Sequence, residues 1–172
     1  AVLTSPDGIT WTSRATRASG GWYEVTWSGT QFVTVGASGT IRTSPDGVTW
    51  TARTSGSTQT LNGVTWSGTQ FVAVGFGGTI LTSSDGINWI TRTSGTINGL
   101  NGVTRSGTQF VAVGANGTIL TSPDGVTWTK RTSGTSTTIN KVIWDNTQFL
   151  AIGNNGAIVT SPDGVTWTTR TS

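Results

Sequence analysis

The sequence predicts an all-β fold built from repeated four-stranded antiparallel units, and three observations support that prediction. A phrase close to Ser-Pro-Asp-Gly-Val-Thr-Trp occurs five times at a constant interval of 39 residues, beginning at Ser5, Ser44, Ser83, Ser122 and Ser161. The copies are separated by short runs rich in Val, Ile, Thr, Trp and Phe, each bounded by Gly, Asn, Asp or Ser. No insertion disturbs the period. Such regularity is typical of repeat proteins, in which each unit buries its apolar surface against its neighbours.

One unit, read from residue 61, contains four predicted strands that we name A to D. Strand A lies in LNGVTWSGT, strand B in QFVAVGFGGT, strand C in ILTSSDG and strand D in INWITRTSG. The A-to-B turn is Ser-Gly-Thr, or Asp-Asn-Thr in the last unit, and its Gly or Asn supplies the positive φ of a tight hairpin. The C-to-D turn is Ser-Pro-Asp-Gly. There Pro presets φ, Asp can accept a hydrogen bond from backbone two residues on, and Gly takes the left-handed position.

The alternation within strand B predicts how the units pack together. Phe71 and Ala73 face one side of the sheet and Val72 and Val74 face the other, so both faces are apolar and the units stack face to face. Four-stranded units of about 40 residues with one aromatic at a fixed place describe the blades of a β-propeller. We therefore predict a single propeller domain over 1–172, with an extra C-D hairpin at 1–16 and four full blades at 17–55, 56–94, 95–133 and 134–172.

The repeated phrase is predicted to be structural, and the Trp residues of its last four copies are predicted to lie at the blade interfaces. The Asp and Trp residues that recur in its five copies are Asp7, Trp11, Asp46, Trp50, Asp85, Trp89, Asp124, Trp128, Asp163 and Trp167. The phrase resembles the Asp-box, or BNR, repeat, whose pattern Ser/Thr-x-Asp-x-Gly-x-Thr-Trp occupies the turn between the third and fourth strands of propeller blades. Here Asp and Gly are adjacent and the Trp comes one residue early. The resemblance spans the whole chain and implies a propeller, but Asp-box propellers include sialidases, sorting receptors and a photosystem assembly factor, so it leaves the activity open.

The two ends of the chain do not match in strand count. Residues 1–16 form a C-D hairpin without its A and B strands, while residues 134–172 form a complete last unit that ends in a second, similar hairpin. Two C-D hairpins therefore compete for one A-B pair, or one of them reaches a neighbouring molecule, which predicts strand exchange or closure as a homo-oligomer. The other interpretation is a segment cut from a longer array without regard to blade boundaries.

Composition and charge exclude several classes of function. The chain has neither Cys nor His, which removes disulfides, thiol catalysis, the usual zinc sites and the commonest general base. No stretch approaches the length of a membrane span. The net charge is +3, but the five Asp residues of the phrase are balanced by five Arg residues that follow it, and the other charges are scattered. We therefore predict neither membrane insertion nor nucleic-acid binding.

Differences between the copies concentrate on one side of the predicted disc. The A-to-B and C-to-D turns emerge on one side and are nearly invariant, whereas the B-to-C turns and D-to-A loops emerge on the other side and vary. The variable B-to-C turns are Ala37-Ser38, Phe76-Gly77, Ala115-Asn116 and Asn154-Asn155. A binding surface on a fixed scaffold would show this pattern, and so would drift in exposed loops.

The candidate binding residues are the positions where one copy departs from the others. Tyr23 and Glu24 are the only Tyr and Glu of the chain, and Phe76 is the one aromatic residue in a B-to-C turn. Arg105 stands where other copies have Trp, so it either stacks on a neighbouring aromatic ring or marks an exposed edge. Trp22 is in register with Leu61 and is expected in the core. The candidate set for a ligand or partner is Tyr23, Glu24, Phe76, Arg105, Asn116, Asn154 and Asn155.

No catalytic, cofactor or metal site is predicted. A sialidase-like site would need an arginine cluster and a Tyr with a carboxylate partner, whereas Tyr23 and Glu24 are adjacent and would point to opposite faces of a strand. Each repeated turn offers one carboxylate, too few for a calcium site. The leading hypothesis is a non-enzymatic scaffold for a protein partner that binds on the variable side. The alternatives are a glycan-binding lectin with sites between blades near Phe76, Asn116, Asn154 and Asn155, and an excised or engineered repeat segment without a ligand.

Overall fold

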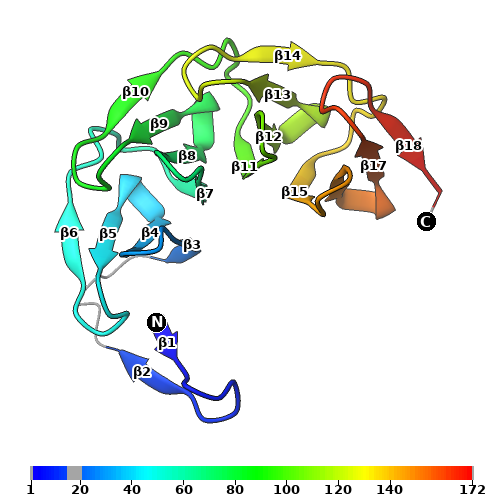
Figure 1. Ribbon diagram of the computed structural model, residues 1–172. Helices are drawn as coiled ribbons and strands as arrows, with labels where there is room; N and C mark the ends of the chain where they lie inside the picture. The colour runs from blue at the N-terminus through cyan, green and yellow to red at the C-terminus, as the bar shows by residue number, and fades with distance from the viewer. Residues whose placement is uncertain (1, 15–20, 172) are drawn as a thin grey trace.

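The computed structural model describes residues 2–14 and 21–171, and these form antiparallel sheets arranged around a common centre (Figure 1). Four sheets have four strands each, in the chain order A-B-C-D, and a two-stranded sheet precedes them. The fold is that of a β-propeller with four-stranded antiparallel blades, as the sequence predicts. The expectations for residue 1, for 15–20 at the end of the first hairpin and start of the next loop, and for residue 172 lie outside the described residues.

The two-stranded sheet and the first two blades lie within residues 2–92. The two-stranded sheet is β1 (Val2–Thr4) and β2 (Thr12–Arg14), blade 1 is β3 (Trp22–Trp27), β4 (Phe32–Gly36), β5 (Ile41–Ser44) and β6 (Thr51–Arg53), and blade 2 is β7 (Leu61–Trp66), β8 (Phe71–Gly75), β9 (Ile80–Ser83) and β10 (Ile90–Arg92). Blades 3 and 4, within residues 100–170, have the same four strands in the same order. Blade 3 is β11 (Leu100–Arg105), β12 (Phe110–Gly114), β13 (Ile119–Ser122) and β14 (Thr129–Arg131), and blade 4 is β15 (Ile139–Trp144), β16 (Phe149–Gly153), β17 (Ile158–Ser161) and β18 (Thr168–Arg170).

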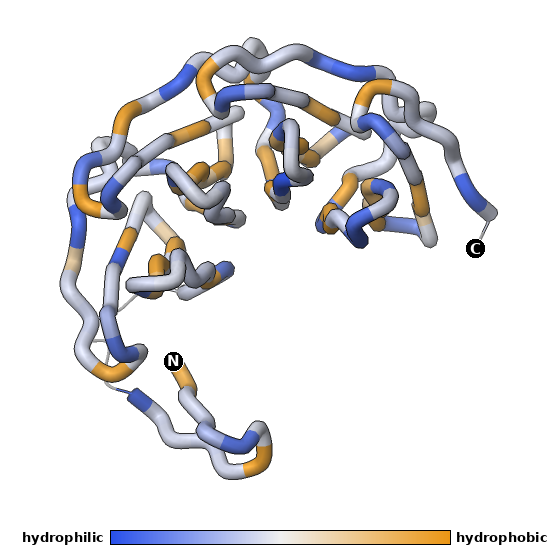
Figure 2. The backbone as a smooth tube through the Cα atoms, in the orientation of Figure 1, coloured by the Kyte–Doolittle hydropathy of each residue, from blue (hydrophilic) through white to orange (hydrophobic). Residues whose placement is uncertain are grey.

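The core lies between successive blades. Val33, Val35 and Ile41 of blade 1 pack with Leu61 and its neighbours in blade 2, and the same cluster recurs between blades 2 and 3 and between blades 3 and 4. Phe71 and Ala73 belong to the cluster on one side of β8, and Val72 and Val74 to the cluster on the other. This confirms the predicted two-faced packing, and Figure 2 shows apolar stretches on the inner strands as well as at the outer turns.

The blades form an open arc. The A strands lie innermost and the D strands outermost, and the two ends of the chain lie on opposite sides of the opening (Figure 1). The β1–β2 hairpin takes the place of strands C and D in a blade before blade 1, because Val2 and Leu3 line a cavity against Trp22 and Val25. Nothing among the described residues stands in the place of the two inner strands of that blade.

Two local features differ from the expected strands. Each D strand begins only after the Trp of the repeated phrase, because the phrase forms one long turn, which we call the Ser–Trp turn. Each A strand has a register shift, so that Leu61 pairs with Gly75 while Gly63 pairs with Val74. The residue passed over, Asn62 in this blade, is a β-bulge, and it lets Leu61 and Val64 face the same neighbour.

Trp22 and Trp11 lie near the open end of the arc and are less buried than the residues at the same positions in other blades. Trp22 has the expected register, since it pairs with Gly36 as Leu61 pairs with Gly75. It is nevertheless only half-buried, because none of the described residues forms inner strands in front of it. Trp11 is 57% exposed, whereas Trp167 at the same place in the last blade is 9% exposed.

Candidate functional site

The variable side of the disc carries four B-to-C turns that share one backbone conformation. Each is a single 3-10 turn, η1 (Ala37–Gly39), η2 (Phe76–Gly78), η3 (Ala115–Gly117) and η4 (Asn154–Gly156). The middle residue of each is left-handed, with φ of 54° at Ser38, 63° at Gly77, 54° at Asn116 and 53° at Asn155. Asn tolerates this conformation better than most residues. Asn116 and Asn155 therefore have a structural reason for their positions.

Phe76 and Ile97 are the most prominent apolar side chains of this side. Phe76 is 55% exposed in η2, and Ile97 is 90% exposed in the following D-to-A loop. A Cβ placed on Gly99 would lie 3.7 Å from the Phe76 ring, so the ring covers the end of that loop. A cavity of about 680 Å³ lies beside them, lined by Gly77, Gly78 and residues 91–97. Comparing the copies of the repeat did not single out Ile97, although it is the one large apolar residue in any of the D-to-A loops described.

Amide side chains bridge neighbouring segments on the same side in blades 3 and 4. Asn116 Nδ2 donates to Asn98 Oδ1 at 3.3 Å, and Asn98 Nδ2 donates to Thr118 Oγ1 at 2.8 Å. In blade 4, Asn140 Nδ2 donates to Asn154 Oδ1 at 2.7 Å. The structure therefore brings Phe76, Asn116 and the Asn154-Asn155 pair to one side of the disc, on three successive blades.

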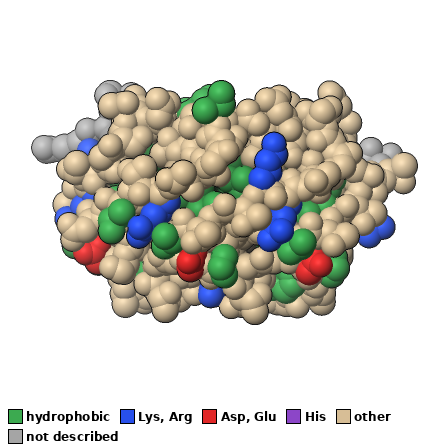
Figure 3. Space-filling model, turned by 90° about the horizontal axis from the view of Figure 1, so that it is seen from above, with side chains coloured by type: hydrophobic (Ala, Val, Ile, Leu, Met, Phe, Trp, Pro, Cys, Tyr) green, Lys and Arg blue, Asp and Glu red, His purple; other side chains and the backbone are tan. Residues whose placement is uncertain are grey.

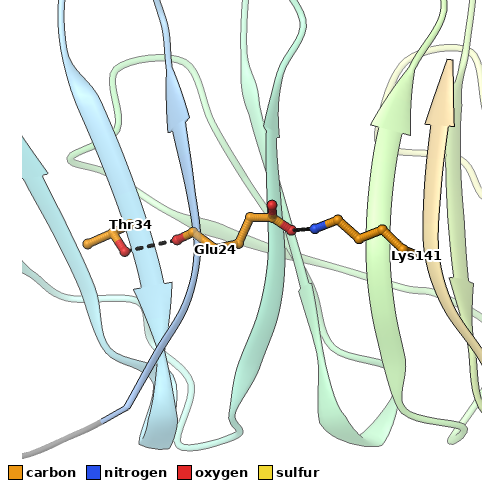
Figure 4. Close-up of polar contacts among 3 residues, drawn as sticks. All are labelled: Glu24, Thr34 and Lys141. Carbon is orange, nitrogen blue, oxygen red and sulfur yellow. Dashed lines mark hydrogen bonds and ion pairs between the residues drawn. The ribbon is translucent and has the colours of Figure 1, made fainter. Parts of the chain in front are cut away.

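Tyr23 and Glu24 lie at the open end of the arc. Tyr23 is 56% exposed, and both line a cavity of about 310 Å³ together with Trp22, Val25 and Thr34. The Glu24 carboxylate forms an ion pair with Lys141 of β15, and the Glu24 carbonyl accepts a hydrogen bond from Thr34 Oγ1 at 2.9 Å (Figure 4). This ion pair joins the inner strands of blades 1 and 4. Lys141 was not among the predicted site residues.

Arg105 is separate from the other candidates, because it ends an A strand on the invariant side. Its guanidinium carbon lies 5.4 Å from the centre of the Phe110 ring, and Nη1 donates to the Ser67 carbonyl of the preceding blade at 3.2 Å. Of the two alternatives expected for Arg105, the structure thus shows the stacking on an aromatic ring. In the other full blades a Trp fills this place, as Trp66 does, with its ring centroid 4.3 Å from that of Phe71.

The Ser–Trp turns on the invariant side use their carboxylates within the turn. In one copy, Asp124 Oδ1 accepts hydrogen bonds from the backbone N–H groups of Val126 and Thr127, both at 2.8 Å. The Ser122 hydroxyl donates to the same oxygen at 3.0 Å. The Thr127 N–H is the largest cause that lowers the pKa of Asp124, since it stabilises the charged form. The pKa of Asp7 is lowered to about 2 by the same bonds.

Two repeated contacts were not foreseen from the sequence. The Arg of each D strand donates from Nε to the Thr hydroxyl of the adjacent C strand, as Arg92 does to Thr82 at 2.9 Å. The Gln at the start of strand B reaches the next blade, where Gln31 Nε2 donates to the Asp85 carbonyl and Gln70 Nε2 to the Asp124 carbonyl, at 2.8 Å and 2.6 Å. We call the second contact the Gln clip. Both contacts hold the scaffold together.

Charge is spread thinly over the surface. On the face seen in Figure 3, basic side chains are scattered, and the acidic side chains lie in a row in the lower half of the view. Among the described residues, no group of three or more Asp and Glu side chains lies together in a way that could hold a metal ion. No helix within residues 2–14 and 21–171 is long and apolar enough to cross a membrane.

Comparison with known proteins finds similarity at the level of structure. No protein-family model and no curated protein matches the chain. Among solved structures, it is similar to YCF48 from Cyanidioschyzon merolae, with a TM-score of 0.75 and 20% sequence identity over 94% of this chain and 60% of that one. It is also similar to YCF48 bound to D1 peptide, with a TM-score of 0.71 and 18% identity over 89% of this chain and 54% of that one. The chain thus spans less than two thirds of the length of both proteins, and what it shares with them is the propeller fold.

Proposed function

We propose that this chain is a non-enzymatic β-propeller scaffold that binds a segment of a partner protein on its variable side. The observation that carries the proposal is the pair of exposed apolar side chains, Phe76 and Ile97, beside a cavity of about 680 Å³. Both residues stand in loops that differ from their counterparts in other blades, while the blades themselves repeat. A rigid scaffold with an exposed aromatic anchor is suited to protein recognition.

The chemistry of the cavity favours a peptide segment with an apolar side chain. Ile97 lines the cavity, Phe76 precedes Gly77 of its wall, and the Thr and Ser side chains among residues 91–97 supply hydrogen-bonding groups. One of the proteins with a similar fold, YCF48, has been solved bound to a peptide, which supports this kind of partner for a propeller of this shape. The position of the Ser–Trp turn between strands C and D supports a place among the Asp-box propellers.

The lectin remains the second candidate, on one specific observation. Asn98 and Asn116 present amide groups on the variable side, one blade from the exposed Phe76 ring. Aromatic rings with nearby amides are a combination that suits sugar binding. The amides bond to each other and to Thr118, however, so that only part of their capacity is free for a ligand.

The non-enzymatic part of the proposal is supported by how the carboxylates are used. The Asp side chains of the Ser–Trp turns hold backbone N–H groups, and Glu24 is paired with Lys141. We expect no hydrolysis of a fluorogenic sialoside by the purified chain. Hydrolysis above the buffer rate that disappears in Tyr23→Phe would contradict this.

Selection of peptides from a phage-displayed library against the immobilised chain tests the binding site. We expect enriched peptides to bind Phe76→Ala at least about tenfold more weakly, because truncation of a central aromatic anchor removes most of its contact area. The control is Ile9→Ala, which removes another exposed apolar side chain, 85% exposed, from the invariant side. Equal binding to both variants would contradict the proposed site. A glycan-array signal that is lost in Phe76→Ala would favour the lectin.

A further inference from the structure

Each blade joins the next through the same set of contacts, and the chain shows this junction three times. The face turned toward the next blade, which we call the trailing face, presents Val33, Val35 and Ile41 in blade 1. The face turned toward the preceding blade, the leading face, presents Leu61 and Phe71 in blade 2 together with its neighbours in the cluster. All of these residues are fully buried, at 0% exposure. The junctions are therefore dry and closely packed.

The trailing face of blade 4 has no blade in front of it among the described residues. Its corresponding residues are Leu150, Ile152 and Ile158, and Ile152 is 49% exposed where Val74 and Val113 are 0% exposed. Ile143 adds to the same face, also 49% exposed, at a position where the other blades have Thr. This face is thus at least as apolar as those that are buried, and it is open.

The leading face of blade 1 is covered only in part, by the β1–β2 hairpin. Val25 is 55% exposed where Val64 is 4% exposed, and the cavity of about 310 Å³ lies over it. Thr34 and Arg42 replace the Ala and Leu of the other leading faces, but both are bonded within the blade. Thr34 Oγ1 donates to the Glu24 carbonyl, and Arg42 Nη1 donates to the Trp50 carbonyl at 3.3 Å.

The polar contacts that join successive blades are not made from blade 4 to any of the described residues. The Gln clip runs over 54 residues, so Gln148 of blade 4 would reach the Ser–Trp turn of a following blade, in the position that Asp46 holds in blade 1. Asn62 Nδ2 and Asn101 Nδ2 donate to carbonyls of the next A strand, at 2.9 Å and 3.0 Å. Asn140 turns instead to Asn154 of its own blade.

Charge at the inner strands fits the same junction. Positions 24, 63, 102 and 141 are equivalent, and successive ones are adjacent, since a Cβ on Gly63 would lie 3.3 Å from Gly102 Cα and one on Gly102 would lie 3.4 Å from Lys141 Cα. A blade 4 placed before a blade 1 would therefore set Lys141 beside Glu24. These are opposite charges, and they already pair within one molecule.

We propose that copies of this chain associate head to tail, with the trailing face of blade 4 in one copy packed on the leading face of blade 1 in the next. The intact blade 4 takes the place now held by the β1–β2 hairpin. That hairpin yields because it is the less anchored of the two: Leu3 is 51% exposed, whereas Val159, at the equivalent position, is 1% exposed. The contact is heterologous, so it forms a ring where its rotation closes and a filament where it does not.

Light scattering over a wide range of protein concentration tests the apolar part of this contact. We expect the mass of the wild-type chain to rise with concentration, and Ile152→Asp to associate at least about tenfold more weakly, because a carboxylate on the trailing face must be desolvated at the junction. Ile90→Asp is the matched control, since it makes the same change at an Ile that is 55% exposed in the outer strand β10, and it should associate like the wild type. A wild type that stays monomeric at every concentration, or an Ile152→Asp variant that associates like the wild type, would overturn the proposal.

A charge exchange tests whether the junction lies between copies. Glu24→Lys and Lys141→Glu each place like charges at every junction, so each variant alone should associate about fivefold more weakly. In an equimolar mixture the copies alternate and every junction regains an opposite pair, so association should return to the wild-type level. The double variant should also return to that level on its own. A mixture that behaves as the average of its two components would show that the pair acts only within one molecule, and would overturn the proposed junction.

Discussion

At the scale of single residues, the Asp side chains of the Ser–Trp turns act as turn caps. Each accepts two backbone N–H groups and a Ser hydroxyl, which is the capacity that a carboxylate would otherwise offer to a ligand. Five such turns repeat this arrangement with nearly the same distances. The carboxylates are largely exposed to solvent, so their contribution is local order in the turn.

Because of this role, we expect the free energy of unfolding to fall as the pH is lowered into the range where these carboxylates titrate. The pKa of Asp124 is lower in the folded chain than in the unfolded chain, so its stabilising effect is complete above the unfolded value of about 3.9 and is lost as the pH falls through the folded value. We expect Asp124→Asn to lose less stability than the wild type between neutral pH and pH about 3, because Asn accepts the same bonds without titrating. Urea unfolding midpoints across this range give the comparison. Two curves that run parallel would contradict the assignment.

At the scale of elements, the glycine that ends each B-to-C turn is required by a close approach of backbone. A Cβ on Gly117, where φ is +65°, would lie 1.9 Å from the Thr135 carbonyl oxygen. Gly95 has a similar φ of +72°, but a Cβ there would meet nothing within 4 Å. The two glycines thus separate the cost of a left-handed residue from the cost of a clash.

We expect Gly95→Ala to lower the free energy of unfolding by about 1 kcal/mol, the cost of the left-handed conformation for a residue with a Cβ. Gly117→Ala should lower it by about 3 kcal/mol, because the turn and the D-to-A loop must also move apart. Chemical denaturation of the two variants measures the difference. Equal losses would mean that the loop yields freely at Gly117.

The elements also show which features could be predicted from the sequence. The alternation of Phe71 and Val72 was enough to predict two apolar faces, because period 2 is a local property of a strand. The bulge in strand A was missed, although the three-residue spacing of Leu61 and Val64 carries its signal. The late start of the D strands was missed because the hydrogen bonds of the Ser–Trp turn extend beyond its Gly.

The candidate site could be predicted only in part, because its local features show in the sequence and its contacts between distant segments do not. Differences between copies located the variable side and Phe76, since a turn that departs from its repeats can be recognised in one sequence. The partners of these residues depend on contacts between segments, such as Asn98 with Asn116 and Glu24 with Lys141, which lie 18 and 117 residues apart. The Gln clip had a visible signal, because Gln stands at the start of every strand B, but its partner lies 54 residues away in the next blade.

At the scale of the whole molecule, stability resides in the junctions between blades. In a repeat architecture the total is close to a sum of terms for each unit and for each contact between neighbours. Val113 and Ile152 hold the same position in strand B of blades 3 and 4, but Val113 is 0% exposed in a junction and Ile152 is 49% exposed on the open trailing face. The pair therefore measures what a junction contributes.

We expect Val113→Ala to lower the free energy of unfolding by about 2 kcal/mol, because it leaves a gap in a dry junction. Ile152→Ala removes more carbon atoms and should still cost less than about 1 kcal/mol, because its side chain loses little water on folding. Urea unfolding at low protein concentration makes the comparison, so that contacts between copies do not contribute. A loss in Ile152→Ala as large as that in Val113→Ala would mean that the trailing face of blade 4 is covered within a single chain.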